Sequence, residues 1–309
     1  MGTGELAALA DAVFWAGAGV TTKRLSAAVR PIHVSALLAT VATCALIVIA
    51  LATGHADNVV QAPALSVALF AAGAVAGAAG MLLFFVAISS GSVGATFTTT
   101  SGLYILFSMV AGVVFLGDDA GPSTYAGAVA IVAGIWLLNT RAAPAKQAIP
   151  IAPAVGERRA GRRVHFSRAV ITSLSAGSLV AALWAVDLIL SAKGLEEADL
   201  LTNGLVHQVV PAVLFGSFLL LNRRARRAQF QARDLRMLAV AGTLYVCSTL
   251  SWNYALANTD AGITALLAST SPVFALVFAG VILRERLPRA SLAGAALAFA
   301  GIVAVVGTR

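Results

Sequence analysis

The sequence is dominated by long apolar runs that recur along almost its whole length, each about 18 to 25 residues long. In helical form that length crosses a hydrocarbon core of roughly 30 Å, because a helix rises about 1.5 Å per residue. Hydrocarbon offers no water to backbone polar groups, so a spanning segment must be a helix or a strand of a closed barrel. The runs show no alternation of apolar and polar residues, which excludes the barrel.

These runs predict an all-α integral membrane protein with about ten transmembrane helices. Composition agrees, since 59% of the residues are hydrophobic and only 11% are charged, whereas a soluble domain carries roughly a quarter charged residues. The predicted spans are residues 5–22, 32–53, 64–88, 93–116, 122–139, 168–191, 201–221, 236–257, 262–283 and 289–307.

Basic residues are unevenly distributed over the loops between these spans. The loops after the first, third, fifth, seventh and ninth spans hold 19 of the 21 Lys and Arg residues, all except Lys193 and Arg309. An excess of Lys and Arg marks the cytoplasmic face of a membrane protein. The sequence therefore predicts a multi-pass protein of the cytoplasmic (inner) membrane with both termini outside the cytoplasm. The net charge of +8 reflects this topology, and nucleic acid is not an expected partner.

The spans fall into two groups separated by a segment rich in proline and arginine. We predict a first five-helix repeat at 1–139, a basic cytoplasmic linker at 140–167 and a second five-helix repeat at 168–309. Trp15 and Trp184 occupy matching positions in the two halves. An odd number of helices in each half inverts the second half relative to the first. Inverted repeats are typical of secondary transporters, in which they give alternating access to a site near the midplane.

Several motifs resemble one family of transporters. The stretch Ala265-Leu266-Leu267-Ala268-Ser269-Thr270-Ser271-Pro272-Val273-Phe274-Ala275-Leu276, followed by Leu283-Arg284-Glu285-Arg286-Leu287, resembles the C-terminal repeat of EamA-type transporters of the drug/metabolite transporter superfamily. Phe14-Trp15-Ala16-Gly17-Ala18 and Leu183-Trp184-Ala185-Val186-Asp187 are similar to the first-helix motif of that family. The resemblance implies ten helices in two inverted five-helix units and efflux or exchange of small metabolites, often amino acids.

Few ionisable residues lie inside the spans. Asp187 lies one helical turn after Trp184 in an otherwise apolar run. Such a group is costly in a bilayer and usually faces a cavity, so Asp187 is a candidate for proton coupling or for balancing the charge of an amine; the alternative is that it reaches the headgroups. His207 is a second candidate for proton coupling, or else forms an interhelical hydrogen bond. Asp11, one turn before Trp15, has the same two alternatives as Asp187, and its closeness to the terminus favours the interfacial one.

Aromatic and hydrogen-bonding side chains recur within the other spans. Buried Trp and Tyr need partners for their N–H and O–H groups, and small hydroxyl residues either pack helices closely or contact a solute. The predicted substrate-binding residues are Trp15, Thr99, Ser101, Trp184, His207, Gln208, Trp252, Asn253, Tyr254 and Ser271. Pro272 removes one helix hydrogen bond, so a bend that could act as a hinge is expected there.

Motifs for enzyme chemistry are missing from the sequence. It contains no nucleophile elbow, P-loop, zinc-protease motif or dinucleotide fingerprint, and its four histidines are scattered. We therefore expect no catalytic residues, no metal site and no cofactor.

The leading hypothesis is a secondary transporter that moves a small organic metabolite by alternating access, as efflux. The substrate would be an amino acid, a related compound or a drug-like solute. Proton coupling and uncoupled uniport or exchange both stay open, and so do a monomer and a homodimer. A membrane-embedded enzyme or a structural membrane protein is the alternative from another class. The expected partners are the small-molecule substrate, the lipid bilayer and, under coupling, protons.

Overall fold

The computed structural model describes residues 2–25, 29–90, 93–118, 121–139, 168–222, 231–283 and 289–306, and every regular element in these ranges is a helix. In chain order the elements are α1 (Thr3–Leu25), α2 (Pro31–Ala52), α3 (Ala56–Gln61), α4 (Ala64–Ser90), α5 (Val93–Ala111), η1 (Gly112–Leu116), α6 (Pro122–Asn139), α7 (Arg168–Leu195), α8 (Leu200–Leu221), α9 (Ala232–Asn258), α10 (Ala261–Ala268), α11 (Ser271–Leu283) and α12 (Arg289–Val306). The predicted linker at 140–167 lies outside the described residues.

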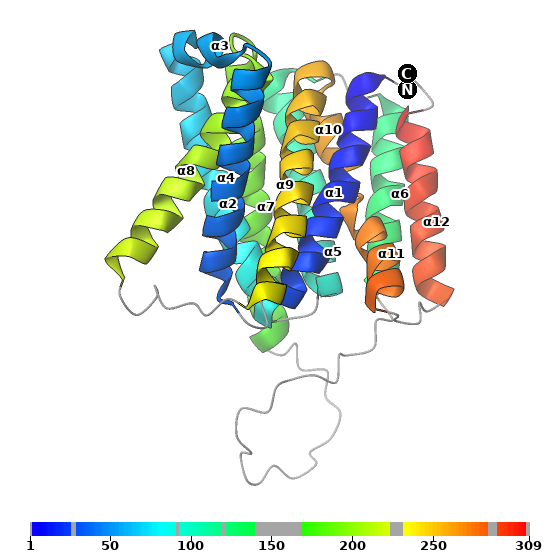
Figure 1. The fold of residues 1–309 in the computed structure, drawn as a ribbon. Coiled ribbons are helices and arrows are strands. Elements are labelled where there is room, and N and C mark those ends of the chain that lie inside the picture. The colour runs from blue at the N-terminus through cyan, green and yellow to red at the C-terminus, as the bar shows by residue number, and fades with distance from the viewer. Residues whose placement is uncertain are drawn as a thin grey trace.

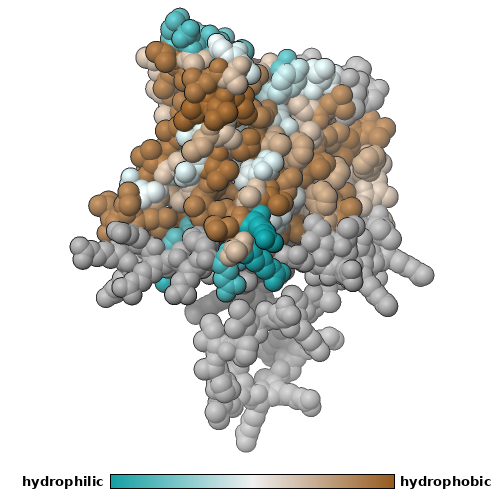
Figure 2. All heavy atoms as spheres, in the orientation of Figure 1, coloured by the Kyte–Doolittle hydropathy of each residue, from teal (hydrophilic) through white to brown (hydrophobic). Residues whose placement is uncertain are grey.

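Within the described ranges the helices form ten rods of membrane-spanning length, because α3 only connects two rods, η1 continues α5, and α10 and α11 share one rod (Figure 1). By length and composition, six stretches of the described residues are apolar enough to cross a membrane, and two shorter apolar helices lie at Pro122–Leu137 and Ala293–Val305. Hydrophobic side chains cover most of the face seen in Figure 2. The prediction of an all-α membrane fold is confirmed.

The two remaining rods, α1 and α9, carry more polar residues and pack against each other. Their polar groups turn inward, as Asp11 on α1 and Asn253 on α9 show by their burial. A helix with this arrangement needs less overall hydrophobicity because its lipid-facing surface remains apolar.

The first rod before residue 140, α1, and the first rod after residue 167, α7, run in opposite directions. We call the end of the bundle where α1 begins and α12 ends the terminal face, and the end where α6 stops and α7 starts the loop face (Figure 1). α1 descends from the terminal face, whereas α7 rises toward it. The main contacts pair the rods across the halves: α1 with α9, α4 with α7, α2 with α8, and α6 with α12. Each of these pairs joins a helix before the linker to one after it.

The pair of α6 and α12 shows how close such contacts become. A Cβ atom added at Gly134 would lie 2.6 Å from the carbonyl oxygen of Gly294, and one added at Gly127 would lie 2.8 Å from that of Gly301. These distances leave room only for glycine, because real Cβ contacts do not become that short. Small residues at helix crossings let two backbones approach in a bilayer.

The ninth predicted span differs from the structure, because it is not one continuous helix. α10 ends at Ala268 and α11 begins at Ser271, and the hydroxyl of Thr270 donates to the carbonyl of Leu267 at 2.6 Å in the turn between them. Pro272 lies in the first turn of α11, where a helix does not need its N–H group. The break places backbone and hydroxyl groups in the interior of the bundle. A hinge at Pro272 stays a prediction.

Candidate functional site

A cavity lies in the interior of the bundle, between α1, α4, α5, α7, α8, α9 and the break between α10 and α11. Its volume of about 180 Å³ is many times the roughly 10–15 Å³ that a single water molecule needs. The residues that line it are Asp11, Trp15, Ala74, Gly77, Ala78, Met81, Ser101, Tyr104, Trp184, Asp187, Asn203, His207, Gln208, Pro211, Tyr245, Ser248, Thr249, Trp252, Asn253, Ala268, Ser269 and Ser271. This lining, which is drawn from the described residues, includes two carboxylates and one imidazole but no Lys or Arg.

An aromatic cluster forms one part of the wall. The rings of Trp15 and Trp184 meet edge to face, with their centroids 5.9 Å apart. Phe84 lies 5.7 Å from Trp15 and 5.3 Å from Trp184, and Tyr245 lies 6.1 Å from Trp15. These separations fall in the range in which aromatic rings attract each other beyond simple burial. The cluster gives the cavity a rigid apolar wall.

Both carboxylates lie on the terminal-face side of this cluster. Asp11 precedes Trp15 on a helix that descends from the terminal face, and Asp187 follows Trp184 on a helix that rises toward it. The inverted directions of α1 and α7 therefore bring an earlier residue of one helix and a later residue of the other to the same side of the aromatic cluster.

Asp187 belongs to a chain of polar groups that links α7, α8 and α9. Its Oδ1 atom lies 2.5 Å from Nε2 of His207, and Nδ1 of His207 lies 2.9 Å from Oδ1 of Asn203. The amide of Asn203 then donates to Oδ1 of Asn253 at 2.5 Å, and the amide of Asn253 donates to the backbone carbonyl of Thr249 at 2.7 Å. The interhelical bond was one of two predicted roles for His207, and its partner is the acid singled out from the sequence.

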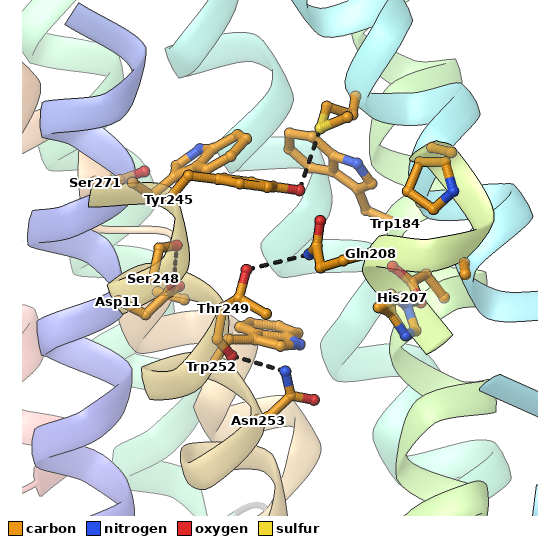
Figure 3. A pocket seen from close by; sticks show the side chains of 18 of the residues that line it. Asp11, Trp184, His207, Gln208, Tyr245, Ser248, Thr249, Trp252, Asn253 and Ser271 are labelled. Atoms are coloured by element: carbon orange, nitrogen blue, oxygen red, sulfur yellow. Dashed lines mark hydrogen bonds and ion pairs between the residues drawn. The ribbon is translucent and has the colours of Figure 1, made fainter. Parts of the chain in front are cut away.

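Asp11 has simpler surroundings. The hydroxyl of Ser248 on α9 donates to its Oδ1 atom at 2.5 Å, and the Asp11 residue is only 7% exposed. Figure 3 shows Asp11 and Ser248 together on one wall of the cavity, with His207 on the other side and Thr249 and Trp252 between them. The expected interfacial position of Asp11 is wrong, because α1 begins well before this residue and carries it into the interior.

Glycines on α4 make room for the acid on α7. A Cβ atom added at Gly73 would lie 2.9 Å from Oδ1 of Asp187, one added at Gly77 would clash with Oδ2 of Asp187, and one added at Gly80 would lie 2.6 Å from Nε1 of Trp184. The spacing places these three glycines along one face of α4. The close contact of α4 and α7 thus holds both Trp184 and Asp187 in position at the cavity.

Most of the predicted substrate-binding residues converge on this cavity. Those that line it are Trp15, Ser101, Trp184, His207, Gln208, Trp252, Asn253 and Ser271, together with Asp187. Thr99 and Tyr254 do not line it: the methyl group of Thr99 faces Gly177 on α7, and Tyr254 is 39% exposed, with its hydroxyl 3.4 Å from that of Thr3. Consecutive helix residues point about 100° apart, so Trp252, Asn253 and Tyr254 cannot all face one cavity.

Sequence reasoning missed several lining residues. Asp11, Tyr104, Asn203, Tyr245, Ser248 and Thr249 were not among the predicted site residues. A helical period supplies a signal for two of them, because Tyr245 and Ser248 recur with the predicted Trp252 three and four residues apart on one face of α9. Tyr104 and Asn203 lie within apolar segments and carry no comparable pattern.

A second pocket of about 590 Å³ lies along η1, α5 and α6 and is larger than the cavity. Its lining is almost wholly apolar and includes exposed side chains such as Val114 and Trp136. Exposed apolar surface is expected where a membrane helix meets lipid. We therefore place the candidate site in the smaller cavity, where the ionisable groups meet.

Known proteins identify the family. A model of the EamA-like transporter family matches residues 2–140 and 172–307. The chain belongs to the EamA-like transporter family. An 80-residue stretch is 36% identical to a protein of Streptantibioticus cattleyicolor named "Probable terminal-alkyne amino-acid exporter", and the match covers 25% of this chain and only 27% of that relative. A crystal structure of another protein matches 99% of this chain and 96% of its own with a TM-score of 0.78 at 16% identity, a likeness that shows the fold alone.

Proposed function

We propose that this EamA-family transporter exports a small organic metabolite that carries an amine, such as an amino acid, through the cavity by alternating access. The observation that carries the proposal is the lining of the cavity, which combines two carboxylates with an aromatic wall and, among the described residues, no Lys or Arg. Such a lining favours a solute with a positive group and an apolar body. The relative named as an amino-acid exporter supports the same class of substrate.

Alternating access is supported by the way the helices pair. α1 with α9 and α4 with α7 are equivalent contacts when the two halves are exchanged, and both border the cavity. Two such arrangements of similar energy would open the cavity first to one face and then to the other. The broken rod of α10 and α11 borders the same cavity and offers a point where the backbone can bend.

We also propose that the Asp187–His207 pair couples transport to protons. The carbonyl of Thr249 can only accept, so Asn253 donates to it, Asn203 donates to Asn253, and Nδ1 of His207 donates to Asn203. Nδ1 therefore carries a hydrogen, and the 2.5 Å contact between Nε2 and Asp187 needs one more proton, on either atom. Loss of this proton would set a lone pair against a carboxylate and separate α7 from α8. The other titratable groups that face the cavity are Asp11 on α1, Tyr104 on α5 and Tyr245 on α9.

Flux into liposomes tests this function. Purified protein would be reconstituted and supplied with radiolabelled L-phenylalanine, L-leucine or phenethylamine, with and without an imposed pH gradient. We expect accumulation against a gradient of the amine when a proton gradient is present, and we expect Asp187→Asn to abolish accumulation while leaving exchange. Asp57→Asn makes the same chemical change at an exposed position on α3 and serves as the control. The amine-export proposal fails if the wild type transports none of these solutes, and the coupling proposal fails if flux ignores the pH gradient.

We place the loop face in the cytoplasm and both termini outside it. Among the described basic residues, Lys23, Arg30, Arg233 and Arg236 lie near the loop-face ends of α1, α2 and α9, and Lys193 lies near the terminal-face end of α7; this excess at the loop face agrees with the positive-inside rule. A reporter enzyme fused after Arg309 tests the orientation in cells. Activity restricted to the outside of the cytoplasmic membrane is expected, and cytoplasmic activity would reverse the topology.

A further inference from the structure

The two carboxylates of the cavity differ in whether a basic group is available to them. Nε2 of His207 lies within 2.5 Å of Asp187, so the proton that they share leaves this pair without net charge. Within the described part of the chain Asp11 forms no ion pair, and its side chain accepts one hydrogen bond, from the hydroxyl of Ser248. A carboxylate inside a membrane either takes up a proton or needs a compensating cation. When ionised, Asp11 is therefore the carboxylate of the cavity for which the described residues supply no cation.

The surroundings of Asp11 suit an organic cation. Ser248 occupies Oδ1 of the carboxylate and leaves Oδ2 open for a further donor. Tyr245, Ser248 and Trp252 lie three and four residues apart on α9, so two aromatic rings flank the bond between Ser248 and Asp11. Aromatic faces attract ammonium groups most strongly where water is excluded. Elsewhere in the cavity lining, the buried hydroxyl of Ser269 has no hydrogen-bond partner among the described residues.

We propose that Asp11 is the subsite that binds the ammonium group of the substrate, and that the substrate's apolar portion lies against Trp15 and Trp184. The ligand class is a primary amine or amino acid with an apolar or aromatic side chain. The two acids then have separate roles: Asp11 binds the solute, while Asp187 holds the proton together with His207. This assignment rests on the proposed amine-export function and names the place where the amine binds.

Binding measurements on the purified protein separate the two acids. The probes are phenethylamine, L-phenylalanine and 3-phenylpropanoate, which share a phenyl ring but differ in their ammonium and carboxylate groups. Fluorescence of the tryptophans in the cavity wall would report binding, with isothermal calorimetry as a second readout. The wild type should bind both amines and bind 3-phenylpropanoate far more weakly.

The variants give the decisive comparison. Asp11→Asn should weaken phenethylamine binding by roughly tenfold or more, since removing one member of a desolvated charge pair typically lowers affinity by at least that factor. Asp187→Asn should weaken phenethylamine binding less than Asp11→Asn does, and Asp57→Asn is the control for the chemical change. Asp11→Glu retains the charge and should bind the amine more tightly than Asp11→Asn; equal loss in both would mean that packing alone is responsible and would overturn the subsite.

Three other outcomes would contradict part of the proposal. If Asp11→Asn binds phenethylamine as the wild type does, or if the wild type binds 3-phenylpropanoate as tightly as phenethylamine, the subsite assignment is wrong while transport itself still stands on the flux assay. If Asp187→Asn loses the amine and Asp11→Asn retains it, the roles of the two acids are exchanged. Failure of the wild type to transport any amine in liposomes would instead remove the function on which the subsite rests.

Discussion

The two acids of the cavity both lie on its terminal-face side but have different partners. Asp187 on α7 meets an imidazole, which is fixed in turn by two asparagines and a backbone carbonyl on neighbouring helices. Asp11 on α1 meets one hydroxyl on α9 and otherwise faces the cavity. Both acids accept at Oδ1 and both line the cavity, but the described residues supply a basic group only to Asp187. The proposed ammonium subsite rests on this difference.

Contacts between helices follow the same division. The chain from Asp187 to Thr249 crosses three helices, so a change in its protonation acts on the packing of α7, α8 and α9 together. The bond between Ser248 and Asp11 crosses only α1 and α9, which already pack along their length. Loss of a proton at the first acid should therefore move helices, and loss of a ligand at the second should change little besides occupancy.

The largest expected effect comes from removing His207, the partner of Asp187. His207→Ala leaves the Asp187 carboxylate without its cation, which should lower the free energy of unfolding by about 3 kcal/mol. This is the low end for a buried pair, because the two side chains keep 17% and 20% of their exposure. Thermal unfolding in detergent would measure the loss. The double variant Asp187→Asn/His207→Ala should recover part of it, and a double variant less stable than His207→Ala alone would contradict a stabilising pair.

A smaller effect is expected from filling the groove that receives Asp187. Gly77→Ala places a Cβ against the carboxylate, so either the Asp187 side chain leaves His207 or α4 and α7 separate, and stability should fall by about 2 kcal/mol. Gly216→Ala on α8 is the matched control, because a Cβ there meets nothing within 4 Å. Thermal unfolding and gradient-driven flux should both suffer in the first variant. Equal behaviour of the two variants would show that the carboxylate is not held where the structure places it.

Asn203 tests whether the polar chain acts as a unit. Asn203→Ala leaves Nδ1–H of His207 and Oδ1 of Asn253 without partners, which should cost about 1–2 kcal/mol. Because Asn203 positions the imidazole and does not touch Asp11, the pH dependence of flux should shift while phenethylamine affinity remains near that of the wild type. Asn203→Gln or Asn203→Ser should restore part of the pH profile. An unchanged pH profile in Asn203→Ala would remove this residue from the proton pathway.

The fold was largely predictable from the sequence, and the site only in part. The length of each apolar run reflects the thickness of the bilayer, and the distribution of basic residues reflects which side of the membrane each loop occupies. Both features can be recognised in each segment separately. Asp187 and His207 could be singled out from the sequence, because an ionisable group in an apolar run is conspicuous. The contact between them could not be predicted, since it joins residues 20 positions apart on two helices whose rotation depends on packing.

Asp11 shows where position along the chain misleads. It lies near the start of the chain, yet α1 begins at Thr3, so the second and third turns of this helix already lie inside the bundle. A bend was expected at Pro272, but not the complete break between α10 and α11, because apolar composition predicts a span and not its continuity. The packing of α1 against α9 buries Asp11 and brings it to Ser248. This packing is a tertiary contact that no local sequence pattern predicts.

The smallest expected effect lies at Ser248. Ser248→Ala removes one hydrogen bond from Asp11 and leaves the carboxylate itself in place, so stability should fall by only about 1 kcal/mol. Amine binding should weaken only a few-fold, because the charge that attracts the ammonium is retained and the vacated Oδ1 can accept from the ligand. Titration with phenethylamine would measure this beside Asp11→Asn. A loss in Ser248→Ala as large as that in Asp11→Asn would mean that the hydroxyl, and not the charge of Asp11, determines affinity, and the contrast between the two acids would then lose its electrostatic basis.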